Sequence, residues 1–212
     1  MRIDIISKEY PPAIYGGAGV HVAELVRALR ERGDVEVQVR CFGAPRDEAD
    51  TTAYADLPQL AHANAALQTL GVDVQIAADC AGADIVHSHT WYANLAGHLG
   101  GLLAGAPHIV TAHSLEPMRP WKAEQLGGGY RVSSYAERAA YEGAAAVIAV
   151  SAGMRADILR SYPSLDPDKV VVVHNGIDSQ LWSPTDAPNI VRKHGVDPCL
   201  LYTSPSPRDR TR

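Results

Sequence analysis

Short apolar runs alternate with longer amphipathic segments along this chain. Most of the runs are continuously apolar and rich in β-branched residues, a pattern typical of strands that are buried on both faces of a sheet. The predicted strands cover residues 3–6, 35–41, 85–88, 109–112, 146–150 and 170–173.

The segments between these runs have helical periodicity. In residues 19–32 the apolar positions fall on one face, at Val22, Leu25, Val26 and Leu29, and Gly33 follows as a stop signal. Further helices are predicted at residues 61–70, 92–104, 130–143 and 152–161. Ser151 is the predicted N-cap of the last of these.

Repeated strand–helix–strand units predict an α/β fold, with a Rossmann-like, mostly parallel sheet covered by helices on both faces. Ligands of such sheets bind outside the carboxyl ends of the strands. Candidate chemistry is therefore expected in the segments that follow the predicted strands, at residues 7–19, 88–91, 113–116, 151 and 174–178.

Composition narrows the class of protein. The 212 residues are 46% hydrophobic and 20% charged, which suits one globular domain. No apolar run is long enough to span a membrane, and no secretory signal is visible, so a cytoplasmic protein without a membrane partner is expected. The net charge of −5 argues against a nucleic-acid partner, and the three cysteines have no spacing typical of disulfides or zinc.

A glycine-rich segment precedes the first predicted helix. Gly16 and Gly17 would allow an anion to approach the free amides of the helix N-terminus, although a plain turn is the alternative. A dinucleotide fingerprint fits poorly, because Val22 takes the place of its last glycine and no acid ends the second strand. A phosphate or sugar near these glycines is favoured.

Two histidines lie two residues apart at the end of a predicted strand. His87 and His89 lack the further ligands of a metal site, because neither an HExxH motif nor a Cys/His cluster is present. No metal and no cofactor are therefore predicted. The alternative is a pocket rim of hydrogen-bonded histidines, beside which the indole of Trp91 could stack on a sugar.

The segment after the fourth predicted strand carries an acid and a base. His113 and Glu116 could form a catalytic pair, whereas the lack of a GxSxG elbow argues against a serine hydrolase. Residues 121–131 are predicted to form a glycine-hinged loop in which Lys122 and Arg131 could receive a phosphate. A solvated surface loop explains that segment equally well.

Six motifs together resemble the N-terminal half of the GT-B retaining glycosyltransferases. In chain order they are KEYPP from Lys8, GGAGVH from Gly16, HSHTW from His87, TAHSLEP from Thr111, AVSAGM from Ala149 and HNGID from His174. The segment PWKAEQLGGGY from Pro120 is the most particular match, and it is similar to the actinobacterial branch that makes glycogen and maltose 1-phosphate. Tyr15 and Thr90 depart from the better-known bacterial glycogen synthases, which carry lysine and aspartate there.

The resemblance implies two Rossmann-like domains that face each other across a cleft, with the nucleotide sugar held mainly by the C-terminal one and the acceptor by this one. It implies that Gly16 and Gly17 lie near the donor diphosphate and that His113 is the catalytic residue, beside the anomeric carbon. The expected substrate- or acceptor-binding residues are His89, Trp91, Glu116, Lys122, Tyr130, Arg131 and Asn175.

The function implied is transfer of glucose, with retention, from ADP-glucose or UDP-glucose to an α-1,4-glucan or glucose 1-phosphate. Two alternatives stay open: another small acceptor such as an inositol, or a non-catalytic sugar- or nucleotide-binding module. Residues 1–198 are the predicted acceptor-side domain of a longer parent whose C-terminal domain is missing, so the fragment alone is expected to be inactive. Oligomers are possible.

The last segment breaks the strand–helix rhythm. Residues 199–212 are biased towards Ser, Pro and Arg and show no usable period. We expect them to be a non-native tail.

Overall fold

The computed structural model describes residues 1–180, 192–193 and 195. Residues 1–176 form one compact unit, which carries every strand and helix discussed below, and residues 177–212 belong to a second unit. The expected domain end at residue 198 and the expected tail at 199–212 lie outside the described residues.

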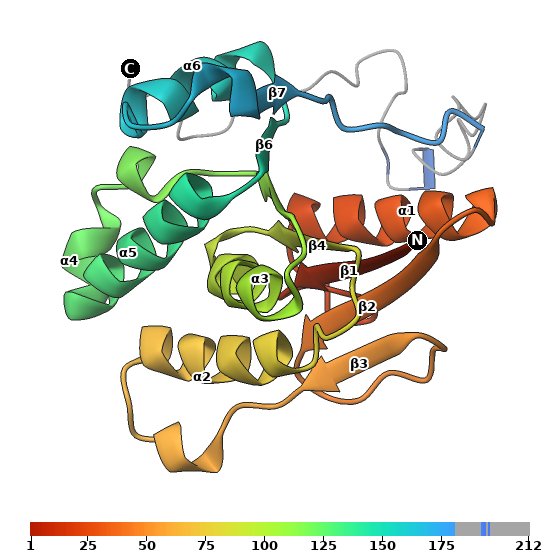
Figure 1. Ribbon diagram of the computed structural model, residues 1–212, viewed down its shortest axis with the longest axis horizontal. Coiled ribbons are helices and arrows are strands. Elements are labelled where there is room, and N and C mark those ends of the chain that lie inside the picture. Colours follow the sequence, from red (N-terminus) through yellow and green to blue (C-terminus); the bar gives the residue numbers. More distant parts are fainter. Residues whose placement is uncertain (181–191, 194, 196–212) are drawn as a thin grey trace. The chain divides into compact units, whose positions relative to one another are not determined.

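The compact unit is built on one parallel sheet in the order β3-β2-β1-β4-β5-β6-β7 (Figure 1). Its strands are β1 (Arg2–Ser7), β2 (Glu36–Phe42), β3 (Thr51–Tyr54), β4 (Ile85–His89), β5 (His108–Ala112), β6 (Ala146–Ala149) and β7 (Val170–Val172). All six neighbouring pairs are parallel. The predicted α/β, Rossmann-like class is confirmed.

Helices cover both faces of this sheet, and Figure 1 shows α1 and α2 on opposite sides of β1 and β2. The helices are α1 (Gly17–Arg32), α2 (Ala65–Ala78), α3 (Trp91–Ala104), α4 (Lys122–Leu126), α5 (Gly128–Gly143) and α6 (Ala152–Ser161). Ile5 packs in one core cluster with α1, whereas its neighbour Ile6 packs in another with α2 and α3. Among the described helices, none combines the length and the apolar character needed to cross a membrane.

Two predicted helix ends are confirmed in detail. Gly33 closes α1 with a φ of 71°, a left-handed conformation that glycine adopts without strain. Ser151 caps α6, because its hydroxyl accepts a hydrogen bond from the amide of Met154 at 3.0 Å.

The predicted helix at residues 61–70 is wrong in position. Asn64 is the N-cap of α2 and accepts a hydrogen bond from the amide of Ala66, so the helix starts later and then continues through Gly71. That glycine leaves room for a neighbour, because a Cβ there would lie 2.6 Å from Cδ1 of Leu60. The edge strand β3, which buries only Tyr54, was not predicted.

The predicted loop at residues 121–131 is also wrong. It folds into α4 and the first turn of α5, with a break at Gly127, whose φ is 52°. One glycine therefore provides the whole change of direction, and the residues on either side are helical.

A glycine also sets how closely α3 approaches the sheet. A Cβ on Gly97 would lie 2.3 Å from Nε2 of His108 and 2.8 Å from Cβ of Ser88, two residues of the strands beneath the helix. The helix that begins at Trp91 can therefore lie directly on β4 and β5.

We expect Gly97→Ala to lower the free energy of unfolding by roughly 1–3 kcal/mol, because an added methyl group would overpack this contact. Gly153→Ala is the matched control. A Cβ added at Gly153 would lie 3.8 Å from its nearest neighbour, Oγ of Ser151. Alanine should therefore raise the free energy of unfolding by up to about 1 kcal/mol, because it favours the helix more than glycine does. Urea unfolding followed by circular dichroism measures both, and an equal effect of the two variants would contradict the close approach.

Candidate active site

Three parallel strands end side by side at the candidate site. Ser7 of β1 pairs with His89 of β4, and His89 pairs with Thr111 of β5. The segments that leave these strands therefore start at one edge of the sheet. His113, two residues beyond Thr111, meets His89 there.

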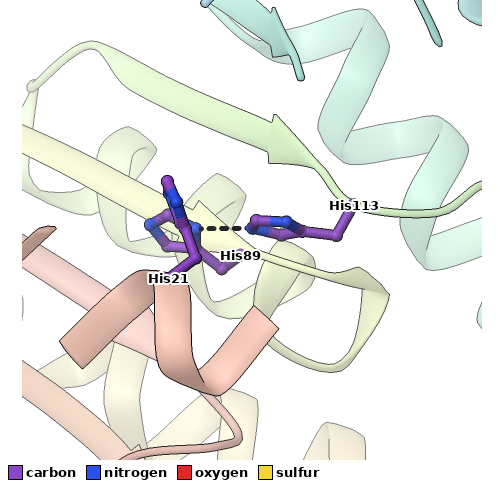
Figure 2. Close-up of side chains that lie close together, drawn as sticks. All are labelled: His21, His89 and His113. Atoms are coloured by element: carbon purple, nitrogen blue, oxygen red, sulfur yellow. Dashed lines mark hydrogen bonds between the residues drawn. The ribbon is translucent and has the colours of Figure 1, made fainter. Parts of the chain in front are cut away.

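A third histidine completes the cluster. Figure 2 shows His21 of α1 beside His89 and His113. The ring centroid of His21 lies 5.6 Å from that of His89 and 5.0 Å from that of His113. His89 is fully buried, and the other two are partly exposed.

One hydrogen bond joins two of these rings, with Nδ1 of His89 3.2 Å from Nε2 of His113. Nε2 of His89 is buried and has no partner among the described residues. A buried N–H without a partner is rarely found, so the proton of His89 belongs on Nδ1 and is donated to His113. A neutral His113 then carries its own proton on Nδ1.

Burial keeps this cluster neutral. It lowers the pKa of His113 to about 4, with a further contribution from His21. Burial also lowers the pKa of His89 well below its usual value and, to a smaller degree, that of His21. At pH 7 the cluster therefore offers hydrogen-bonding imidazoles and no positive charge.

The hydrogen bond of His87 goes to a residue outside the cluster. Its Nε2 lies 2.7 Å from Oγ1 of Thr111, and burial lowers its pKa to about 3. The two histidines differ in their hydrogen-bond partners, but their rings stay in contact, with centroids 4.3 Å apart. His87 supports the cluster from inside the sheet.

The glycine segment at the start of α1 already holds an anion. Oε2 of Glu9 accepts hydrogen bonds from the amides of Tyr15 at 3.0 Å and Gly16 at 2.7 Å. A Cβ on Gly19 would lie 2.7 Å from Cβ of Glu9, so only glycine fits there. The amides of Gly17, Ala18 and Gly19, in the first turn of α1, have no acceptor among the described residues and are left for a ligand.

A cavity of about 570 Å³ lies next to these segments. It combines aromatic walls with amide groups and one lysine, a mixture that suits a sugar. Its lining includes Lys8, Tyr15, Asp56, Asn64, Gln68, Trp91, Tyr92 and Gln125.

Two aromatic rings and a cation order one wall of this cavity. The rings of Trp91 and Tyr92 lie 4.3 Å apart, and Nζ of Lys8 lies 4.0 Å from the centroid of Tyr92. Trp91, a predicted sugar-stacking residue, therefore lines a cavity, although only 6% of it is exposed.

Residue 90 joins the histidine cluster to this wall. Thr90 has a φ of 66° and a ψ of 161°, a region that residues other than glycine rarely occupy. Such backbone strain is tolerated where the surroundings require it. Here it turns the chain sharply between His89 and Trp91.

The sequence model of glycosyltransferase family 4 matches residues 15–181, which is most of the chain. The chain belongs to this family. Family 4 membership agrees with a cleft at the carboxyl ends of the strands and confirms the resemblance drawn from the motifs.

Among its curated relatives, the chain is highly similar to one kind of enzyme. The chain is 58% identical to the alpha-maltose-1-phosphate synthase of Mycolicibacterium smegmatis, over 93% of this chain and 51% of that protein. Identity to the alpha-maltose-1-phosphate synthase of Mycobacterium tuberculosis H37Rv is 54%, with the same coverage. The family 4 chain thus spans about half the length of the curated relatives it matches.

Solved structures support the fold. The Anabaena HepE protein in complex with UDP-glucose aligns with a TM-score of 0.64 at 18% identity, covering 92% of this chain and 50% of that one. At that identity the likeness shows the GT-B type of fold alone.

Other predicted site residues of the family 4 chain have partners of their own. The Glu116 side chain is fully buried, and its two oxygens accept hydrogen bonds from Nζ of Lys122 and Oγ of Ser133, both at 2.7 Å. The hydroxyl of Tyr130 donates to the backbone carbonyl of Glu116 at 2.9 Å. These contacts hold α4 and α5 against the segment that follows His113, and substrate contact by Glu116, Lys122 and Tyr130 stays a prediction.

Arg131 and Asn175 are both exposed and lie outside the histidine cluster. Arg131 lines a separate hollow with residues of α4 and α5, and Asn175 follows β7. Their predicted role in substrate binding is not tested by these positions.

The sequence argument missed three residues of the site. His21 was quoted only as the last letter of a motif, because its place on a helix hides its approach to two strand ends. Lys8 and Glu9 were quoted only within the KEYPP motif, because no spacing rule links them to Gly16 or to Tyr92. The signal available was their position directly after β1.

Glu137 is a second buried acid, in contact with the backbone of Glu116. Oε1 of Glu137 accepts hydrogen bonds from the amide of Glu116 at 2.8 Å and the hydroxyl of Tyr162 at 2.5 Å. Burial nevertheless raises the pKa of Glu137 from 4.5 to about 7. The folded protein thus keeps a proton that the unfolded chain loses between these two values.

We expect the free energy of unfolding to fall as pH rises from about 4.5 to about 7, because the unfolded state releases this proton first. Glu137→Gln keeps an acceptor oxygen and cannot ionise. Its stability relative to wild type should rise by roughly 2–3 kcal/mol between about pH 5 and pH 8. Urea unfolding at each pH tests this, with exposed Glu142→Gln as the control, and parallel profiles for Glu137→Gln and wild type would contradict it.

Proposed function

We propose that the chain is the acceptor-side half of a retaining glucosyltransferase that moves glucose from ADP-glucose or UDP-glucose onto glucose 1-phosphate. The observation that carries the proposal is the 58% identity to a protein named for alpha-maltose-1-phosphate synthesis. Maltose 1-phosphate contains one glucose more than glucose 1-phosphate, which makes glucose 1-phosphate the acceptor. An α-1,4-glucan is the longer acceptor expected from the resemblance.

The cavity beside β1 and β4 supports an acceptor of this kind. Its aromatic walls suit the apolar face of a glucose ring, and its amide side chains can hydrogen-bond to hydroxyl groups. Lys8 offers a positive charge in a partly buried position. A phosphate on the acceptor would pair with it.

His113 is proposed to contact the transferred glucose. With Nε2 accepting from His89, its Nδ1–H is the group left to donate to a sugar hydroxyl. Transfer with retention passes through oxocarbenium-like character at the anomeric carbon. A neutral hydrogen-bond donor that is already in position can bind the glucose more strongly in the transition state. It adds no second positive charge beside the anomeric carbon. His113 is not proposed to be a nucleophile.

The donor diphosphate is proposed to approach the first turn of α1. The amide of Gly17 is available there, whereas Gly16 already donates to Glu9. The rest of the donor site is assigned to a C-terminal domain beyond the described residues, because the chain spans about half of its relatives. Donor and acceptor must meet in one cleft for a rate of biological use.

To test the proposal, we would assay the chain alone and joined to the C-terminal half of the Mycolicibacterium relative, with each nucleotide sugar and glucose 1-phosphate. We expect maltose 1-phosphate, detected by NMR, only from the joined protein. His113→Ala should lower kcat by more than about tenfold with little change in acceptor KM, because the contact strengthens in the transition state.

The exposed His62→Ala variant is the control and should keep wild-type kinetics. Steady-state rates are normalised to the folded fraction, since a purely structural histidine would reduce only that fraction. Turnover by the chain alone would refute the proposed division, and an unchanged kcat would remove His113 from the site. Failure of the joined protein to transfer glucose, with sugar binding retained, would favour the non-catalytic module.

Lys8→Gln should raise the KM for glucose 1-phosphate by about tenfold or more, since a charged hydrogen bond to phosphate contributes roughly 1.5–3 kcal/mol. The KM for an unphosphorylated glucan should change little, because no phosphate is lost. Lys169→Gln is the control, since Lys169 lies beside a different hollow. An equal rise in KM for both acceptors would exclude Lys8 as the phosphate partner.

A further inference from the structure

Four aromatic side chains line the cavity beside β1 and β4, and they offer a ligand very different amounts of surface. Phe42 is 8% exposed and Trp91 is 6% exposed. The ring of Tyr92 already has Nζ of Lys8 4.0 Å from its centroid and the ring of Trp91 4.3 Å away. Tyr15 is 71% exposed, and within the described residues no other ring and no cation lies against it. Its ring is therefore the aromatic surface of this cavity that is left for a ligand.

We propose that Tyr15 is an acceptor-binding residue, against whose ring the glucose ring of the acceptor stacks. The inference rests on the proposed function, because it takes glucose 1-phosphate as the acceptor. The apolar face of the sugar would lie on the phenol ring, and its hydroxyl groups would reach the amide side chains of the lining, such as Asn64 and Gln68. The sequence-based expectation gave the stacking role to Trp91, which is packed inside the protein.

Backbone hydrogen bonds fix the position of Tyr15 at the cavity. Oε2 of Glu9 accepts from the amide of Tyr15 at 3.0 Å and from the amide of Gly16 at 2.7 Å. The side chain of Glu9 packs against α1, where Gly19 leaves room for it. A tyrosine side chain has only two rotatable bonds, so it loses little conformational entropy when a sugar binds. Glu9 is therefore a positioning residue for this ring.

Tyr15 and Lys8 recognise different parts of the acceptor. An aromatic ring contacts the face of a sugar whether or not the sugar carries a phosphate, whereas an ammonium group pairs with the phosphate itself. Loss of the Tyr15 ring should therefore weaken phosphorylated and unphosphorylated acceptors by the same factor. Loss of Lys8 should weaken only the phosphorylated one.

Binding to the chain itself tests the stacking role, because every residue in the argument belongs to the described part. We would titrate the ¹⁵N-labelled chain with glucose 1-phosphate and, separately, with maltose, and fit dissociation constants to the NMR shifts. Tyr15→Ala should weaken the binding of both sugars by about tenfold, because the stacking surface is lost. Tyr15→Phe keeps the ring and should stay within about twofold of wild type.

Tyr135→Ala is the matched control, because Tyr135 is 67% exposed on α5 and is not part of the cavity lining. It should bind both sugars as wild type does. Thermal unfolding followed by circular dichroism checks that each variant is folded, and exposed side chains tolerate this change. The stacking role is overturned by wild-type affinity in Tyr15→Ala, by an equal loss in Tyr135→Ala, or by wild type that binds neither sugar below about 50 mM.

Kinetics of the joined protein separate this inference from the transfer proposal. Tyr15→Ala should raise the KM for both acceptors by about tenfold and leave kcat near wild type, because the ring contacts the acceptor and not the transferred glucose. Transfer with an unchanged acceptor KM in Tyr15→Ala would overturn the stacking role and leave the transfer proposal in place. Absence of transfer, with Tyr15-dependent binding by the chain, would refute transfer and support the stacking role.

Discussion

Ser7, His89 and Thr111 lie side by side across three parallel strands, and this register determines which residues can meet at the site. Side chains alternate between faces along a strand, so a slip of one residue would turn each site residue to the other side of the sheet. The register is held by apolar layers on both faces, because Ile5 packs towards α1 and Ile6 towards α2 and α3. The chemistry at the sheet edge therefore depends on packing in the sheet interior.

Burial then sets the character of the site. Three imidazoles share a small volume because each is neutral, which removes the repulsion that three cations would have. The one anion that reaches the glycine segment, Glu9, is held by two backbone amides. The same amides would otherwise be free for a phosphate, so Glu9 limits where a ligand anion can bind.

The sequence was sufficient for the parts of the fold that follow local rules. Continuous apolar runs located six of the seven strands, and Ser151 and Gly33 were correctly read as helix ends. β3 was missed because a four-residue edge strand leaves little periodic signal. The predicted helix at 61–70 ended too early, because α2 continues through Gly71, where packing against Leu60 makes glycine suitable inside the helix.

The candidate site was predictable to the extent that it lies on strand ends. His89 and His113 follow neighbouring strands, so their meeting could be expected from a parallel sheet. His21 could not be placed in this way, because the rotation of α1 about its own axis decides whether residue 21 faces the strands. The segment at 121–131 was predicted as a loop from its glycine-rich composition, but it folds into helices. That folding directs Lys122 towards Glu116, a pairing that composition cannot show.

The charges of the described cleft fit the proposed division of labour between two halves. A leaving diphosphate needs cations and amides around it. Within the described residues the cluster is neutral and the glycine segment offers the amide of Gly17 but also the carboxylate of Glu9. Lys8 lines the cavity and lies against the ring of Tyr92. Under the proposed function, this arrangement suits the recognition of an acceptor and its phosphate better than that of the donor diphosphate.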